Sequence, residues 1–220
     1  MTNATLEVVA LRILAAVCAL ATLALASPVR AAVTGNLIVN PDAETGNTSG
    51  WVDALAHGFG VSPGAFAFPV QSGAHSFWAG VTGPASAAWT NEIRQDINVS
   101  AYSSAIDAGT AVAYFSGYGR TNSASGSTDN GRIIVEYRNG VGSVLQSFDT
   151  GNITPVNTWV LEQNSRTAPV GTRTIRVRLL GNRGGGASTD CGFDALSFTL
   201  DGVTAASRSS WGRVKGRYRR

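Results

Sequence analysis

Alternation of apolar and polar residues is the dominant pattern along this chain, and it predicts short β-strands. The stretch Thr172–Leu180 alternates most regularly, with aliphatic residues on one face and arginines near the other. Residues 131–138 also alternate, and they meet Asn139 and Gly140, a dipeptide typical of hairpin turns. By the same pattern we expect strands at 58–61, 65–70, 75–80, 87–99, 111–118, 143–148, 159–163 and 192–200.

Two segments depart from clean alternation. Ser100–Gly109 has two apolar residues spaced as on a helix, so we expect one helical turn there. Within the strand expected at 87–99, the polar residues Asn91 and Gln95 share the phase of the isoleucines. This mixture predicts an irregular strand.

The composition supports an all-β fold. The chain has 220 residues, of which 26 are glycine, and only 14% of them are charged. Many short strands joined by glycine-containing turns fit these values better than a helical bundle does. The length suits a single β-sandwich domain once a leader is removed.

Residues 1–31 have the pattern of a secretory signal peptide. Arg12 precedes an apolar run at 13–26, Pro28 ends the run, and Ala31 closes a cleavage site of small residues. The run is short for a membrane span. The sequence therefore predicts export, with a mature domain at 32–206.

The basic character of the chain is confined to its end. Residues 207–220 carry six basic and no acidic side chains, whereas 32–206 carries nine basic against thirteen acidic. We expect no nucleic acid as a partner of the domain. Aromatic and basic residues interleave in this tail, so it is either a membrane or envelope anchor or a solvated, disordered terminus.

The opening stretch of the domain, Asn36–Trp51, combines a short strand with a turn. Its carboxylates Asp42 and Glu44 are two residues apart, which places them on the same side of an extended chain. Such a pair beside irregular backbone suits a cation that prefers oxygen ligands, and it equally suits two solvated acids at the end of a strand.

This stretch, with the closing segment 192–200, resembles the calcium-bearing jelly-roll carbohydrate-binding modules of the galactose-binding-like superfamily. The resemblance rests on N-L-I-V-N, a following Glu, a glycine turn and G-W, and on an Asp in the closing strand. It implies a jelly-roll β-sandwich whose first and last strands are adjacent. It also implies a structural Ca²⁺ between Glu44 and Asp194, with Asn40 and Asp42 as less regular ligands.

Enzyme signatures are weak. Ser62 lies in a G-x-S-x-G match, but Pro63 and Gly64 favour a turn into a strand over the helix that a nucleophile elbow needs. The two histidines have no partner at metal-ligand spacing. Cys191 is the only cysteine of the mature chain, and we expect a small buried side chain.

Aromatic residues supply the candidate ligand site. Aromatic rings stack on the apolar faces of sugars, while nearby polar groups bind the hydroxyls. Each ring is also a candidate for core packing. The predicted ligand-binding residues are Trp78, Trp89, Tyr118, Arg120, Asn122 and Asp129. A cluster of loops at one end of the sandwich and a concave sheet face both remain open as the place of binding.

The sequence therefore predicts a secreted, non-catalytic, lectin-like module that binds a glycan or cell-surface polysaccharide. The alternative is a structural or adhesive envelope protein anchored by the basic tail, with membrane contact through that tail alone.

Overall fold

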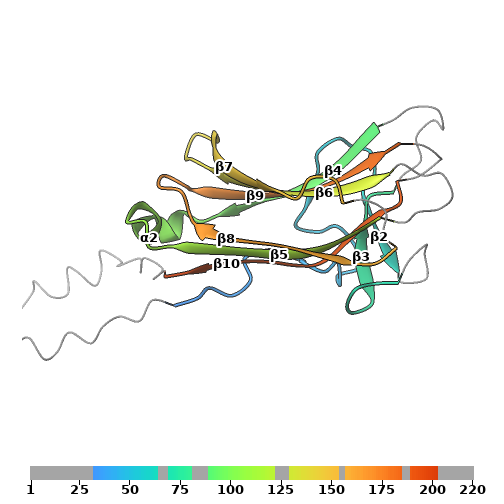
Figure 1. Ribbon diagram of the computed structural model, residues 1–220, viewed down its shortest axis with the longest axis horizontal. Coiled ribbons are helices and arrows are strands. Elements are labelled where there is room, and N and C mark those ends of the chain that lie inside the picture. Colours follow the sequence, from blue (N-terminus) through green and yellow to red (C-terminus); the bar gives the residue numbers. More distant parts are fainter. Residues whose placement is uncertain are drawn as a thin grey trace, which may run out of the picture. The chain divides into compact units, whose positions relative to one another are not determined.

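The protein is an all-β sandwich of two antiparallel sheets, each of five strands (Figure 1). The computed structural model describes residues 32–63, 69–80, 89–121, 129–153, 157–184 and 189–202. The elements are β1 (Val52–Asp53), β2 (Gly60–Pro63), β3 (His75–Trp78), β4 (Trp89–Asn98), the 3-10 helix η1 (Ser100–Tyr102), α2 (Ser103–Asp107), β5 (Val112–Thr121), β6 (Asn130–Arg138), β7 (Val144–Asp149), β8 (Val160–Thr167), β9 (Thr174–Arg183) and β10 (Cys191–Asp201).

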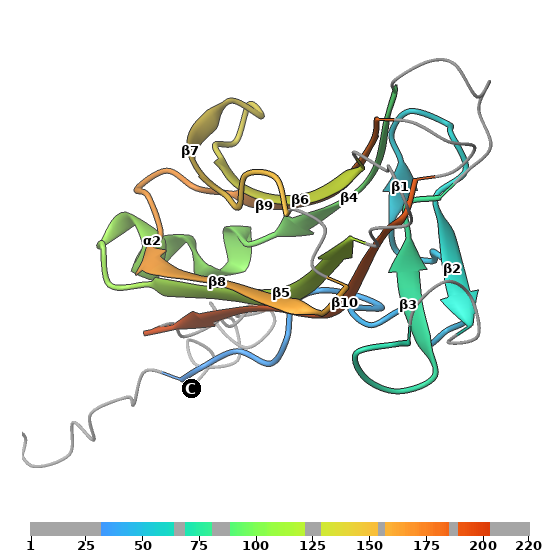
Figure 2. The ribbon, with the colours of Figure 1, turned by 45° about the vertical axis from the view of Figure 1, so that its right-hand side comes forward.

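The strand order is β1-β4-β9-β6-β7 in one sheet, which we call sheet A, and β2-β3-β10-β5-β8 in the other, sheet B. The two layers lie one above the other, and β7 and β8 lie at their edges (Figure 2). This arrangement confirms the predicted jelly-roll β-sandwich.

Alternation places the core between the sheets. In β9, Ile175, Val177 and Leu179 are fully buried, whereas the arginines between them face outward. Phe115 and Phe198 cover these residues from sheet B. The hydrophobic pattern of Thr172–Leu180 therefore predicted the buried face correctly, because alternate residues of a strand point to opposite sides.

Strand β4 is regular, so the predicted irregularity is wrong. It pairs with β9 over ten consecutive residues. Its inward amides are satisfied by backbone groups: Asn91 donates to the carbonyl of Ala79 (3.0 Å), and Gln95 accepts from Val39 N–H (2.8 Å) and donates to Gly50 (3.0 Å). A buried polar side chain with such partners does not disturb its strand.

The first and last segments of the domain are adjacent, as the resemblance implied. Thr34 N–H donates to the Leu200 carbonyl and Leu37 N–H to the Phe198 carbonyl, both at 2.8 Å. Trp51 is buried and donates its indole N–H to the Asn40 carbonyl (3.1 Å), so its role is structural.

Candidate functional site

The predicted metal residues lie where the opening stretch meets the segment before β3. Glu44 Oε1 accepts N–H bonds from Ala74 and His75, both at 2.8 Å, and these bonds hold the Glu44 pKa below its ordinary value. Asp194 Oδ2 accepts N–H bonds from Gln71 and Ser72, both at 3.0 Å. The two carboxylates therefore hold the same segment of chain from its two ends.

Asp194 has the most unusual environment of the predicted ligands. Its side chain is fully buried, and burial raises its pKa to about 6, with a further contribution from the charge of Asp42. Asn40 differs, because its amide bonds within its own loop, to Asn47, Ser49 and Thr45. The structure thus brings Asp42 near Asp194 and leaves the Asn40 side chain in a turn.

The side chains of this region do not by themselves supply enough ligands for a cation. Within the part of the chain that the structure describes, no group of three or more His, Cys, Asp or Glu side chains is arranged to hold a metal ion. The mutual repulsion of Asp42 and Asp194 would be relieved by a cation. An ion there would need backbone carbonyl oxygens to complete its coordination.

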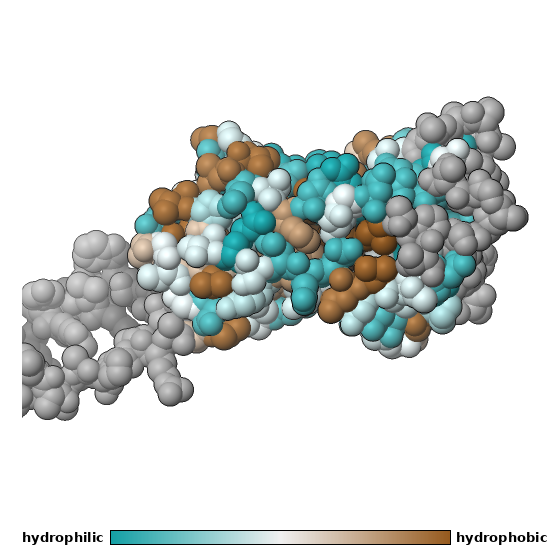
Figure 3. All heavy atoms as spheres, viewed as in Figure 1, coloured by the Kyte–Doolittle hydropathy of each residue, from teal (hydrophilic) through white to brown (hydrophobic). Residues whose placement is uncertain are grey.

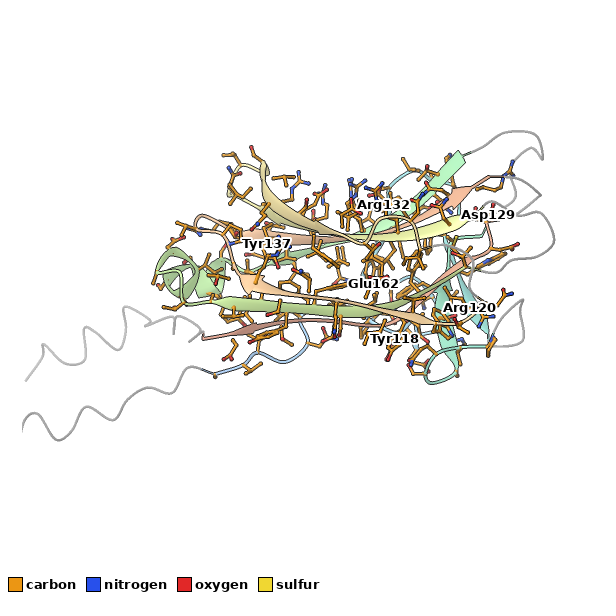
Figure 4. All side chains as sticks on the ribbon, in the orientation of Figure 1. Tyr118, Arg120, Asp129, Arg132, Tyr137 and Glu162 are labelled. Carbon is orange, nitrogen blue, oxygen red and sulfur yellow. The ribbon has the colours of Figure 1, made fainter. Side chains whose placement is uncertain are left out.

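Several predicted ligand residues share the outer face of sheet B. Gly192 of β10 pairs with Trp78 of β3 on one side and with Arg120 of β5 on the other. In the next outward row, Tyr118 pairs with Asp194. Tyr118 and Arg120 accordingly extend from the outer side of this sheet (Figure 4).

These residues differ in their accessibility. Trp78 and Tyr118 are half-buried, while Arg120 is buried and desolvation lowers its pKa. The backbone of Trp89 begins β4, but its side chain lies outside the described residues, as does the whole of Asn122. Asp129 is buried beside the end loops, where it accepts N–H bonds from Gly184 (2.8 Å) and Asp190 (2.9 Å). The ligand roles of these residues stay predictions.

A groove of about 480 Å³ crosses the outer face of sheet B beyond Tyr118. Tyr114 and Ser116 of β5 face outward there, opposite Ser165 and Gln163 of β8. Tyr114 is the most accessible ring in this row, with 44% of its surface exposed. The whole lining consists of Tyr114, Phe115, Ser116, Gln163, Asn164, Ser165, Ser197 and Thr199.

Sequence reasoning missed this groove, although one signal for it was present. Tyr114 and Ser116 occupy the same strand phase as Tyr118, which had been selected as a ligand residue. The outward direction of Ser197 and Thr199 could not be read from the alternation of the sequence. A bulge between Asp194 and Ser197 shifts the phase of β10. Asp194 and Ser197 therefore both face outward although they are three positions apart, and Thr199 follows the phase of Ser197.

The outer face of sheet A carries a network of charges. Arg178 of β9 contacts Glu92 of β4 through two N–H bonds (2.8 and 2.6 Å) and Glu136 of β6 through a third (3.0 Å). Arg132 and Asp149 form another pair on this face, and Figure 4 shows Arg132 on the side away from sheet B. Since these partners satisfy one another, we assign the network a structural role.

The space between the sheets also contains polar groups near the β7 and β8 edges. Glu162 and Tyr137 lie between the layers (Figure 4), and burial raises the pKa of both, that of Tyr137 to about 12. Arg166 lies 5.5 Å from the centre of the Tyr137 ring and donates to the Ser147 carbonyl at 3.0 Å. The Arg166 side chain therefore links the edges of the two sheets.

Exposed hydrophobic side chains gather mainly near the β6–β7 hairpin. Val141, Val144, Leu145 and Val170 each expose more than two fifths of their surface. On the face seen in Figure 3, hydrophobic residues form separate small groups among polar ones. No helix within the described residues is long and apolar enough to span a membrane. The basic tail, 207–220, and the segment 1–31 lie outside those residues, so their roles stay predictions.

Two further sequence expectations concern Ser62 and Cys191. Ser62 is buried in the strand β2, and residues 64–68, which follow this strand, lie outside the described part of the chain. Cys191 is fully buried, and burial raises the pKa of its thiol. A thiol of this kind is unreactive.

The fold and the groove define a jelly-roll sandwich with a polar, tyrosine-bearing surface site. No known family model matches the chain, and no curated protein matches it in sequence.

Solved structures match it in fold. A cyclase from Fischerella sp. TAU has a TM-score of 0.55 at 10% identity, covering 79% of this chain and 100% of its own. The CBM22-1 xylan-binding domain of Paenibacillus barcinonensis Xyn10C has 0.49 at 21% identity, covering 80% and 99%. TmCBM61, solved with β-1,4-galactotriose, has 0.48 at 16% identity, covering 75% and 98%. Carbohydrate-binding modules are thus among the matched structures, and at these identities the similarity concerns the fold alone.

Proposed function

We propose that this protein is a non-catalytic carbohydrate-binding module that binds an uncharged glycan in the groove of sheet B. We also propose that residues 1–31 act as the signal for its export. The groove carries the proposal. Its polar side chains are all neutral hydroxyl and amide groups, which both donate and accept hydrogen bonds. The ring of Tyr114 supplies an exposed apolar surface on which a sugar ring can stack.

The charge distribution supports the choice of an uncharged ligand. The lining of the groove contains no ionisable acid or base apart from the phenol of Tyr114. The charged side chains of sheet A are instead paired with one another on the opposite side of the sandwich. A uronic acid or sulfated sugar would find no counter-charge among the residues that line the groove.

Replacing Tyr114 by Ala should remove most of the glycan binding. A glycan array with the mature domain identifies a neutral sugar that binds, and calorimetry then compares the variants. We expect Tyr114→Ala to weaken binding by about tenfold or more, since a stacked aromatic ring contributes about 0.5–1.5 kcal/mol beyond the apolar area that it buries. Gln163→Ala should weaken it by a smaller factor, because one neutral hydrogen bond is worth about 1 kcal/mol.

Val144→Ala is the matched control, because this side chain is similarly exposed but belongs to β7 of the other sheet. It should leave affinity unchanged. Wild-type affinity in Tyr114→Ala would exclude the groove as the site, and an array without any bound glycan would contradict the function itself.

We further propose that a structural Ca²⁺ stabilises the junction of the opening stretch with the segment before β3. Glu44 and Asp194 would hold it with Asp42, and the ion would offset the repulsion between the two aspartates. Calcium at a hundredfold excess over its Kd should then add about 2.7 kcal/mol to the free energy of unfolding.

Calorimetric melting with Ca²⁺, with Mg²⁺ and with chelator measures this effect. Glu44→Gln should abolish the stabilisation by Ca²⁺, whereas Asp149→Asn, which removes a carboxylate paired with Arg132 on sheet A, should retain it. Equal melting temperatures with Ca²⁺ and with chelator in the wild type would refute the calcium site.

A further inference from the structure

A short segment of chain crosses the outer face of sheet B at one end of the groove. This segment, Pro69–Ser72, is called the strap below. At one side the indole N–H of Trp159, just before β8, donates to the Pro69 carbonyl at 2.9 Å. At the other side Asp194 of β10 accepts the N–H bonds of Gln71 and Ser72, both at 3.0 Å.

The position of these two anchors fixes the path of the strap. Strand β5 lies between β8 and β10 in the sheet, so a segment bound at both neighbours must pass over β5. Strands β8 and β10 are two strand spacings apart, about 9.6 Å, a span that the Trp159 side chain and three extended residues can cover. The crossing occurs near Gly119, which pairs with Val160, the residue that follows Trp159.

Burial along the outer face agrees with this path. Near the strap, Arg120 is only 8% exposed and Asp194 is fully buried. Farther along β5, Tyr114 is 44% exposed, and the groove begins at the row of Ser116. The strap therefore covers the end of the face beyond the row of Tyr118, in which Leu161 is 46% exposed, and leaves this row and the rows of the groove accessible.

The opposite end of the groove has a different character. The next outward row beyond Tyr114 consists of Val112, Thr167 and Asp201. Thr167 is exposed. None of the three described residues of this row has an aromatic or long side chain that could close the groove. Of the two ends, only the strap end has a wall of backbone in the described structure.

We infer that the groove binds the terminus of an uncharged glycan chain, with the terminal sugar against the strap, and does not bind the interior of a chain. This inference rests on the proposed function and specifies its ligand. A chain that continued past its bound sugars would have to pass through the strap. A volume of about 480 Å³ is within the range of about 300–1,000 Å³ typical of small-molecule sites, which fits a short oligosaccharide.

The test uses neutral linear probes: xylo-, cello-, manno- and galacto-oligosaccharides as trisaccharides and hexasaccharides, together with the matching polysaccharides. For the probe series that binds, affinity is measured per mole of chains. We expect the trisaccharide, the hexasaccharide and the polymer to bind within about twofold of one another, because each chain offers one bound terminus. Blocking the recognised terminus with a bulky group, at one end and then at the other, should weaken binding at least about tenfold for one of the two ends.

A second measurement addresses the strap itself. Trp159→Phe retains a ring but loses the N–H bond to the Pro69 carbonyl, so the strap is held at one side only. We expect the penalty for a blocked terminus to fall at least about threefold in this variant. Val144→Ala serves again as the control and should keep the full penalty.

The outcomes separate the two proposals. Affinity that rises in proportion to chain length, together with equal binding of blocked and free chains, overturns recognition of the terminus while leaving glycan binding intact. An unchanged penalty in Trp159→Phe also overturns it, because the strap would then not be the wall. Failure of every probe to bind, blocked or free, overturns both.

Discussion

Replacement of Arg178 by Met is expected to lower the free energy of unfolding by about 3–5 kcal/mol, as is typical when one partner of a buried ion pair is removed. Arg178 is the shared partner of two carboxylates: the Glu92 side chain is 6% exposed and that of Glu136 is 11% exposed. The bond to Glu92 raises the pKa of Arg178, which reflects the same stabilisation of its charged form. Without the guanidinium, the poorly solvated Glu92 would lose its ion-pair partner, whereas Glu136 would keep its pair with Arg138 at 2.6 Å.

Denaturant unfolding measures this loss as a fall in the midpoint at unchanged slope. Arg132→Met is the matched control, because its ion pair with Asp149 is on the same sheet face but exposes about a third of each side chain. Exposed pairs of this kind contribute at most about 1 kcal/mol. Similar losses in the two variants would show that the burial of Glu92 and Glu136 does not matter. Partial recovery on adding Glu92→Gln to Arg178→Met would confirm the uncompensated charge of Glu92 as the cause.

Asp194 is expected to make the protein more stable in mild acid than at neutral pH. Its pKa in the folded state is about 6, whereas the ordinary value is 3.8. The folded state therefore binds a proton in a pH range where the unfolded chain does not, and stability from this group increases as the pH falls through 6. Between pH 7 and pH 5 the gain is about 1–1.5 kcal/mol, it is about 2.4 kcal/mol at pH 4, and it approaches about 3 kcal/mol only below about pH 3.

Comparison with Asp194→Asn isolates this contribution. The amide oxygen can still accept the N–H bonds of Gln71 and Ser72, while the titrating charge is removed. The difference in unfolding free energy between wild type and variant should increase in favour of the wild type as the pH falls from 7 to 5. A difference that is constant with pH would contradict a raised Asp194 pKa.

Calcium gives this pH experiment a second use. An ion bound beside Asp194 favours the ionised carboxylate and so lowers its pKa. Under the proposed calcium site, added Ca²⁺ should stabilise the protein more at pH 7 than at pH 5 and reduce the wild-type gain in acid. A gain that is the same with and without Ca²⁺ would oppose the metal proposal but leave the raised pKa intact.

The local pattern of the sequence determined the sandwich and much of its register. Strict alternation in β9 separated buried aliphatic residues from outward arginines, and the Asn139-Gly140 turn placed β6 and β7 as a hairpin. The motifs of the opening and closing segments also predicted that these segments lie together. Such features depend on neighbouring residues, so they can be read from one sequence.

Strand β4 shows where local reasoning fails. Asn91 and Gln95 interrupt an apolar phase, and by themselves they argue against a regular strand. Their partners are backbone groups 12 and 45 to 56 positions away in the sequence. Only the folded chain supplies these bonds, and they remove the cost of burying the two amides.

The candidate site divides in the same way. The sequence alone placed Tyr118 in the strand expected at 111–118, with Arg120 just beyond its end, and alternation gives Tyr114 and Ser116 the same phase as Tyr118. Which of these rows is open was decided by the strap, whose anchors Trp159 and Asp194 are 90 and 123 positions from their partners. The bulge in β10 then turned Ser197 and Thr199 to the same face. Alternation fixes the side of a sheet to which a residue points, but accessibility depends on distant segments that pack over that side, and only the tertiary structure brings them there.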